Sequence, residues 1–176
     1  MLIALAVLVA VVAGRPLVQR ARDRSAPLSG PGAGIVVRVV DGDTVDVRLA
    51  RGQERVRLLG VDTPETVKPG TPVQCWGPEA SRHTKALLPA GTRVRLVRDA
   101  EVRDRYGRLL AYVWRSRDDR FVNADLVAGG WARVLSIEPN TAYASAFAAA
   151  AAKARAEGRG LWGACPAVER APPAGG

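Results

Sequence analysis

The fold and the chemistry of this chain turn on residues 57–66, which read Arg-Leu-Leu-Gly-Val-Asp-Thr-Pro-Glu-Thr. The segment begins as an apolar strand with one guanidinium and ends, at a proline turn, with the carboxylates of Asp62 and Glu65. Removing a carboxylate from water is unfavourable unless a cation or a hydrogen-bond donor meets it. We therefore expect other segments of the chain to bring partners to this one.

Within this segment, Arg57 and Asp62 are separated by an odd number of positions. In a straight strand they would point to opposite faces, because successive side chains alternate. Gly60 lies between them, and a residue without a side chain makes a bend or bulge easier. For both side chains to serve one site, the strand must bend near Gly60.

Two other segments offer complementary groups. Upstream, residues 41–45 read Asp-Gly-Asp-Thr-Val, and the alternation of apolar residues from 45 to 49 places Asp43 on the apolar face of its strand. Downstream, residues 104–108 read Asp-Arg-Tyr-Gly-Arg. Together the three segments supply two aspartates and a glutamate for a hard cation, and two arginines for a phosphate. This combination indicates phosphodiester chemistry.

The length and the charge are those of one basic domain. A chain of 176 residues is long enough for a single domain with a real core. Lys and Arg number 26 against 17 Asp and Glu, a net charge of +9, which suits a polyanionic partner. An abundance of arginine throughout the proteome is the alternative explanation, because a basic composition by itself is a weak indicator.

The first 13 residues are apolar without interruption. The run is shorter than the roughly 20 residues of a transmembrane helix and suits the core of a signal peptide. Residues 11–13, Val-Val-Ala, offer a cleavage site, whereas no Lys or Arg precedes the run. Either the true start lies upstream or the segment is an uncleaved anchor. We expect an extracellular protein, secreted or tethered to the membrane and facing outward.

Residues 34–164 are expected to form the folded domain, between a linker at 14–33 rich in Arg, Pro, Gly and Ser and a flexible tail at 165–176. Strands are predicted over 35–40, 43–49 and 54–61, around 94–96 and over 109–114. Helices are predicted from Gly77 to about Leu88, from an Asn123 cap to Ala128, and from a Thr141 cap to about Glu157. The pattern favours an α+β fold, a five-stranded OB-type β-barrel with three helices, and such barrels commonly bind nucleic acid.

The chain has two cysteines, Cys75 and Cys165, and one histidine, His83. An isolated cysteine pair in an exported protein is often a disulfide, whereas a cytosolic protein would keep two free thiols. Two distant cysteines and one histidine do not make a zinc site. His83 falls within a predicted helix, where a packing or surface role is expected.

Each motif alone is a weak signal, but together they occur in order and at family-like spacing. From about residue 34 to residue 162 the chain resembles the thermonuclease (staphylococcal nuclease-like) family, through residues 41–45, 57–66, 77–81, 104–112 and 161–162. The resemblance implies a monomeric, calcium-dependent nuclease on an OB-type barrel. Such an enzyme would hydrolyse DNA and RNA, preferably single-stranded, with low sequence specificity, and leave 3′-phosphates.

The resemblance also implies roles for individual residues. The carboxylates of Asp43 and Asp62 and the main-chain carbonyl of Thr63 would hold Ca²⁺, an ion that prefers several oxygen ligands. Glu65 would position or deprotonate the attacking water.

Arg57 and Arg108 would bind the scissile phosphate through their planar guanidinium groups and stabilise its growing charge. Tyr106 would either pack near the phosphate or have a structural role only.

One stretch departs from the family. Residues 136–138 read Ser-Ile-Glu where well-studied relatives carry tyrosines that stack on the nucleotide. Because such stacking is worth about 1 to 3 kcal/mol per base, we predict weaker mononucleotide binding, and the choice between endonuclease and exonuclease action stays open. Two other functions remain possible from the sequence: a catalytically silent OB-fold domain that binds nucleic acid, and a structural membrane-anchored domain.

Overall fold

The structure, a computed structural model, describes residues 32–66, 70 and 72–165. The predictions of a signal peptide or anchor at 1–13, of nearly all of the linker at 14–33, and of a tail beyond Cys165 concern residues outside this part. No helix among the described residues is both long enough and apolar enough to cross a bilayer.

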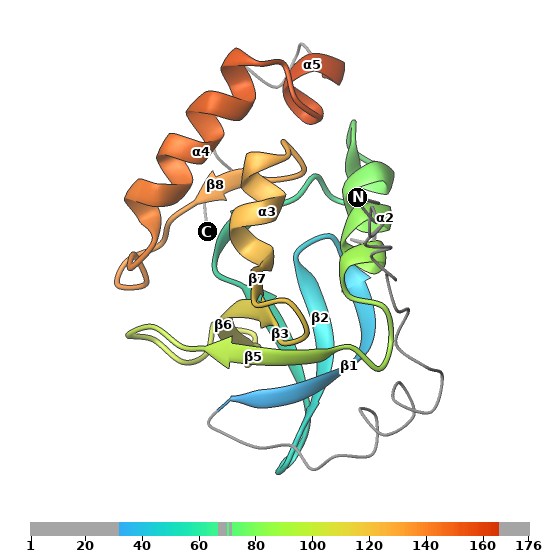
Figure 1. Cartoon of the computed structure of the whole chain (residues 1–176), viewed down its shortest axis with the longest axis vertical. Helices are drawn as coiled ribbons and strands as arrows, with labels where there is room; N and C mark the ends of the chain where they lie inside the picture. The colour runs from blue at the N-terminus through green and yellow to red at the C-terminus, as the bar shows by residue number, and fades with distance from the viewer. Residues whose placement is uncertain (1–31, 67–69, 71, 166–176) are drawn as a thin grey trace, which may run out of the picture.

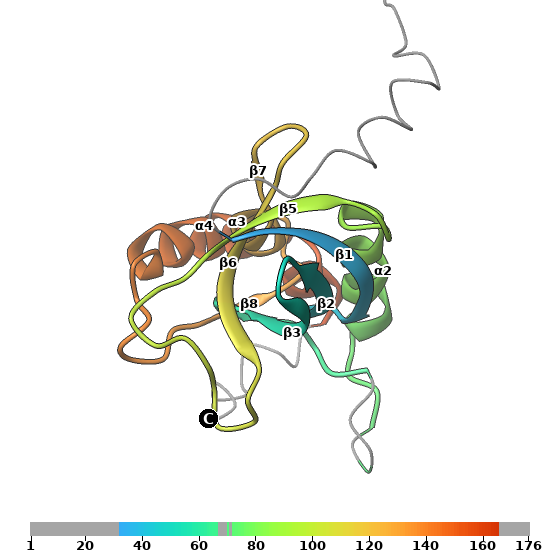
Figure 2. The same ribbon diagram turned by 90° about the horizontal axis from the view of Figure 1, so that it is seen from below.

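The described residues are built around a closed β-barrel. Its five strands are β1 (Ala33–Asp41), β2 (Thr44–Leu49), β3 (Gly52–Leu58), β5 (Arg93–Val97) and β6 (Leu109–Arg115). They pair in the order β3-β2-β1-β5-β6, and β6 pairs back with β3, which closes the ring seen in Figure 2. The closing pair is parallel, and the other barrel pairs are antiparallel. The predicted five-stranded barrel is confirmed.

Three short strands and four helices complete the described fold. The strands are β4 (Gly60–Asp62), β8 (Arg133–Leu135), which pairs with β4, and β7 (Arg120–Phe121), which pairs with β6. The helices are α2 (Gly77–Leu87), α3 (Val122–Ala128), α4 (Ala144–Ala156) and α5 (Leu161–Ala164). They gather over one end and side of the barrel (Figure 1). The three predicted helices are present, and the single-turn α5 is an addition.

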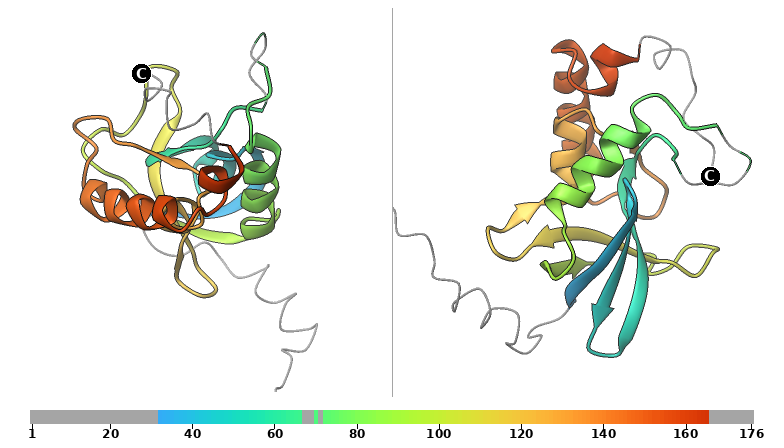
Figure 3. Two further views of the ribbon diagram at one scale, coloured as in Figure 1. Left: turned by 90° about the horizontal axis from the view of Figure 1, so that it is seen from above. Right: turned by 90° about the vertical axis from the view of Figure 1, so that its right-hand side faces the viewer.

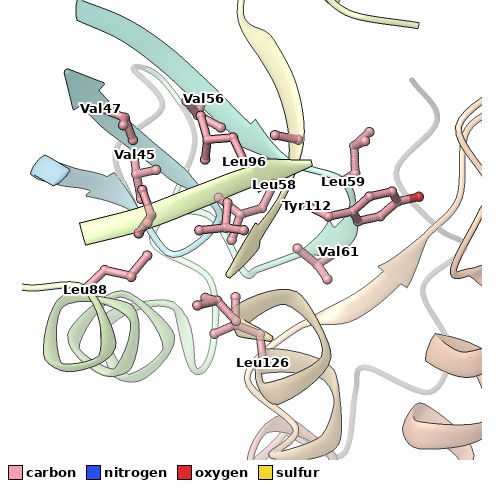
Figure 4. Packing of buried hydrophobic residues seen from close by; sticks show 14 of the residues in the cluster. Val45, Val47, Val56, Leu58, Leu59, Val61, Leu88, Leu96, Tyr112 and Leu126 are labelled. Carbon is pink, nitrogen blue, oxygen red and sulfur yellow. The ribbon is translucent and has the colours of Figure 1, made fainter. Parts of the chain in front are cut away.

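The core fills the barrel and continues beneath the helices. Alternate residues of the strands point inward, and Val45, Val56 and Leu58 are almost fully buried. Leu88, after α2, and Leu126, from α3, close the cluster from the helical side (Figure 4). Each such side chain contributes about 1.5 to 3 kcal/mol on burial. The β-branched residues that predicted the strands therefore also supply the core.

The predicted bend near Gly60 is present. β3 ends at Leu58 and β4 begins at Gly60, whose φ is +74°, a conformation that side chains other than glycine rarely adopt. A Cβ atom at Gly60 would also overlap the ring of Phe147 in α4. Glycine is therefore required twice at this position, by the backbone and by the packing.

The two predicted helix caps are wrong. Phe121 occupies the N-cap of α3 and Tyr143 that of α4, and neither makes a side-chain capping bond. Asn123 lies inside α3 and is buried. Its Nδ2 donates to the carbonyl of Leu59 at 2.8 Å, and its Oδ1 accepts from the amide of Val113 at 2.8 Å. Asn123 thus fixes the strand break beside Gly60 from outside the barrel.

Candidate active site

Arg57, on β3, lies at the centre of the candidate site. Its Nη1 donates to the carbonyl oxygens of Leu58 at 2.7 Å and Val61 at 2.6 Å, so the guanidinium spans the bend between β3 and β4. Its Nη2 lies 3.3 Å from Oδ2 of Asp43 and 3.4 Å from Oδ1 of Asp62. The structure therefore brings together three of the residues predicted from separate segments.

Asp43 belongs to the two-residue turn between β1 and β2 and is buried. Its Oδ2 accepts a hydrogen bond from the amide of Thr63 at 3.0 Å, and its Oδ1 accepts one from the hydroxyl of Thr44 at 3.0 Å. At Gly42, a Cβ atom would lie 2.8 Å from the side-chain carbons of Thr63. This close approach is why the turn before Asp43 carries a glycine.

Glu65 lies in the connection between β4 and α2, which projects from the side of the domain (Figure 3). Its Oε1 accepts a hydrogen bond from the amide of Thr66 at 2.9 Å. The hydroxyl of Thr66 in turn donates to Oδ1 of Asp41 at 2.6 Å. Asp41, at the end of β1, thereby braces the residue that holds the Glu65 carboxylate.

Carboxylates outnumber cations in this part of the molecule. Burial raises the pKa of Asp62, repulsion from Asp43 adds to this rise, and Arg57 opposes it. Burial also raises the pKa of Asp41, against hydrogen bonds from Thr66 and Gly42, and the charges of Asp43 and Glu65 act in the same direction as burial. The site therefore carries an excess of negative charge that a cation would stabilise.

The available donors fit a hard cation only with help from the main chain. Within the part of the chain that the structure describes, no three His, Cys, Asp or Glu side chains gather closely enough to hold a metal ion by themselves. Asp43 and Asp62 do lie beside one guanidinium nitrogen, and the buried hydroxyl of Thr63 has no hydrogen-bond partner. Two carboxylates with further oxygen donors suit Ca²⁺, which also accepts carbonyl and water ligands.

Arg108 and Tyr106 lie on the connection that leads into β6. Leu110 of β6 pairs with Arg57 of β3, and Arg108 comes two residues before Leu110, just outside β6. Its Nε donates to Oδ2 of Asp104 at 2.6 Å, and its guanidinium lies 5.3 Å from the ring centre of Tyr106. Tyr106 is 68% exposed. The structure thus puts Arg108 beside the strand of Arg57 but paired with Asp104 rather than with the carboxylates around Arg57.

Two residues near the site, Arg133 and Gln74, were not predicted from the sequence. Arg133, on β8, is directly opposite Asp62 on β4, and its charge opposes the rise in the pKa of Asp62. The Nε atom of Arg133 is buried without a hydrogen-bond partner. Gln74 hydrogen-bonds to the main chain of Glu65. Both contacts arise from pairings between distant segments, which local sequence patterns do not encode.

The remaining predicted residues, Cys75, Cys165 and His83, make other contacts. Cys75 and Cys165 form a disulfide, with their Cα atoms 6.1 Å apart. His83 stacks on the ring of Trp131 with a centroid distance of 4.2 Å, as its predicted packing role requires.

Comparison with known proteins gives a consistent result. A family model described as "Staphylococcal nuclease homologue" matches residues 55–164, more than half of the chain. Over 128 residues, the chain is 46% identical to a thermonuclease of Staphylococcus intermedius, covering 73% of this chain and 74% of that protein. It is 44% identical over 127 residues to a thermonuclease of Staphylococcus hyicus, covering 72% and 73%. Endonuclease YncB of Bacillus subtilis is 40% identical over 126 residues, covering 71% of this chain and 59% of that protein.

Proposed function

The chain belongs to the staphylococcal nuclease family and is a nuclease acting on nucleic acids, and from this premise we propose a calcium-dependent phosphodiesterase centred on Arg57. It would hydrolyse DNA and RNA with low sequence specificity, prefer single strands and leave 3′-phosphates. The observation that carries this proposal is the position of Nη2 of Arg57 between Asp43 and Asp62, with Glu65 three residues after Asp62 in the sequence.

Asp43, Asp62 and the main-chain carbonyl of Thr63 would hold the Ca²⁺ ion. When bound, the ion would polarise the phosphoryl oxygens as a Lewis acid and offset the negative charge of the carboxylates. The raised pKa values of Asp41 and Asp62 support this assignment, because burial is the main cause of both and neighbouring carboxylates add to it, and a bound cation would favour the charged forms.

Glu65 would accept the proton of the water that attacks phosphorus. A positioned base of this kind typically contributes about 10² to 10⁴-fold to the rate. The bond from the Thr66 amide to Oε1 orients the carboxylate that would accept this proton. The water proton would pass to Glu65 as the water oxygen bonds to phosphorus, the bond from phosphorus to the 5′-oxygen would break, and the departing 5′-oxygen would take up a proton from solvent water.

Arg57 and Arg108 would bind the non-bridging oxygens of the scissile phosphate. The contacts of Arg57 Nη2 with its carboxylates, at 3.3 and 3.4 Å, are longer than a good charged hydrogen bond, so a phosphate can compete for this nitrogen. Arg108 uses its Nε to bind Asp104, which orients the guanidinium and leaves its two Nη groups for a phosphate. Tyr106, exposed beside Arg108, would pack against the substrate.

We also propose that the protein works outside the cell as a monomer, either secreted or tethered by its apolar N-terminal segment. The disulfide between Cys75 and Cys165 supports an oxidising compartment. The net charge of +9 supports association with polyanionic nucleic acid.

The test is cleavage of single-stranded DNA and RNA by the purified full chain, with Ca²⁺ and with a chelator. We expect activity only with Ca²⁺, a loss of at least about 10²-fold for Glu65→Gln, and a comparable loss for Arg57→Ala. Glu101→Gln is the matched control, because Glu101 is an exposed glutamate outside the site. Unchanged cleavage in chelator would exclude the metal-dependent mechanism, and absence of cleavage in every condition would indicate a silent nucleic-acid-binding domain.

A further inference from the structure

Gln74, on the far side of the connection between β4 and α2, makes two hydrogen bonds to the main chain of Glu65. The amide of Glu65 donates to Oε1 of Gln74 at 3.1 Å, and the amide of Gln74 donates to the carbonyl of Glu65 at 3.0 Å. Both main-chain polar groups of Glu65 are therefore satisfied by the same partner. Glu65 lies in neither a helix nor a strand, so these two bonds replace the support that regular structure would give.

Gln74 is itself fixed from two directions. Its carbonyl accepts a hydrogen bond from the amide of Gly77, the first residue of α2, at 3.0 Å. The next residue, Cys75, is bonded covalently to Cys165, which follows α5. The N-terminus of α2 and the C-terminal helix thus anchor Gln74 to the folded body of the domain.

The packing around Gly77 strengthens this connection. A Cβ atom at Gly77 would lie 3.0 Å from the carbonyl oxygens of both Pro64 and Glu65. The start of α2 therefore touches the backbone that carries the proposed base. A displacement of Gln74 or of this helix end has to move Glu65 as well.

We infer that Gln74 is a positioning residue for Glu65, and that the Cys75–Cys165 disulfide acts through Gln74 to hold the base in its working position. The inference rests on the proposed role of Glu65. A general base must keep its carboxylate within hydrogen-bond reach of the attacking water, and small misplacements cost large factors in rate. Loss of the hydrogen bonds between Gln74 and Glu65 should therefore lower kcat. KM should stay unchanged, because neither Gln74 nor the disulfide is a predicted phosphate contact.

The first test compares Gln74→Met, which keeps the length of the side chain and removes its acceptor, with Gln74→Glu, which keeps an acceptor. Gln53→Met, at an exposed position on β3, is the matched control. In the full chain with Ca²⁺ and single-stranded DNA, Gln74→Met should lower kcat about three- to tenfold, the range expected for one hydrogen bond. KM should not change, and Gln74→Glu should restore most of kcat. A kcat for Gln74→Met equal to that of the wild type, or equal losses in Gln74→Met and Gln74→Glu, would overturn the inference.

A double-mutant cycle separates this inference from the proposed function. If Gln74 acts through Glu65, adding Gln74→Met to Glu65→Gln should cause no further loss of residual activity. Cys75→Ser/Cys165→Ser should lower kcat at a temperature where circular dichroism shows an intact fold, and adding Gln74→Met to it should cost less than in the wild type. Fully additive losses would overturn the inference alone. If Glu65→Gln kept the wild-type activity, Glu65 would not be the general base, and both the proposed function of Glu65 and the inference about Gln74 would be wrong.

Discussion

Arg57 and Asp62 meet across a break in the strand that carries both of them: five residues apart in sequence, they place Nη2 and Oδ1 3.4 Å apart. The left-handed conformation of Gly60, with φ +74°, makes this contact possible because it ends β3 and redirects β4. One backbone angle therefore determines whether the guanidinium and the carboxylate share a site.

Gly60→Ala is expected to lower the free energy of unfolding by about 2 to 5 kcal/mol. The left-handed backbone costs about 1 to 2 kcal/mol with any Cβ, and the overlap with Phe147 adds an overpacking cost of about 1 to 3 kcal/mol. Gly91→Ala isolates the first cost, since Gly91 has φ +85° and no atom within 4 Å of a built Cβ. Urea unfolding measures both variants, and equal losses in the two would show that Phe147 does not resist the new methyl group.

Calcium should stabilise the folded chain, independently of catalysis. A ligand that binds only the folded state at 100 times its Kd adds about 2.7 kcal/mol, so Tm should rise with Ca²⁺ and fall back in chelator. Glu65→Gln should keep this rise, because Glu65 is a proposed base and not a proposed ligand. Asp43→Asn should abolish it, although the asparagine retains an acceptor for the Thr63 amide. A full calcium shift in Asp43→Asn would contradict the ligand assignment.

The disulfide should contribute much of the stability of the domain. Its two cysteines lie 90 residues apart, and closing a loop of that size is worth about 4 to 5 kcal/mol in the chain-entropy estimate. Cys75→Ser/Cys165→Ser should therefore unfold at a markedly lower urea concentration than the wild type. Alkylation before and after reduction, followed by mass measurement, checks the bond itself. Two thiols that are alkylated without reductant in exported protein would refute the pairing.

His83 should titrate below its usual pKa. Burial against Trp131 disfavours the imidazolium and lowers the pKa, which Asp125 raises and Arg120 lowers further. Because the folded pKa is the lower one, His83 costs no stability above about pH 6.5 and progressively reduces stability as the pH falls from there toward the folded pKa. The chain has one histidine, so a single imidazole resonance reports it in proton NMR. His83→Phe, which keeps the stacked ring, should remove this part of the pH dependence.

Local patterns predicted the parts of the structure that depend on neighbours in sequence. Asp43 is buried, although it lies in the turn before β2 and not in the predicted strand, and the spacing of Arg57 and Asp62 correctly required a bend at Gly60. The pattern failed at Asn123, whose position before a helical run suggested a cap. Its carboxamide instead bonds to β6 and to the strand break at Leu59, partners that only the folded chain brings near.

The same limit explains what was missed in the site. Arg133 reaches Asp62 because the short β8 pairs with β4, and a three-residue strand leaves no readable alternation. Gln74 lies in the connection between β4 and α2, and its bonds to Glu65 depend on how that connection folds back. In both cases the sequence shows the residue but not its partner. The partner depends on how the chain folds back on itself and cannot be inferred from the spacing of residues.

The parallel pairing of β3 with β6 has a consequence for synthesis and proteolysis. Until Leu109 to Ala111 reach Val56 to Leu58, the barrel is an open sheet whose two outer strands have unpaired main-chain groups. A fragment that ends before residue 109 would keep those edges permanently, and exposed edges recruit strands from other chains. Nascent or clipped forms of this protein are therefore expected to aggregate, whereas closure of the barrel pairs β3 with β6.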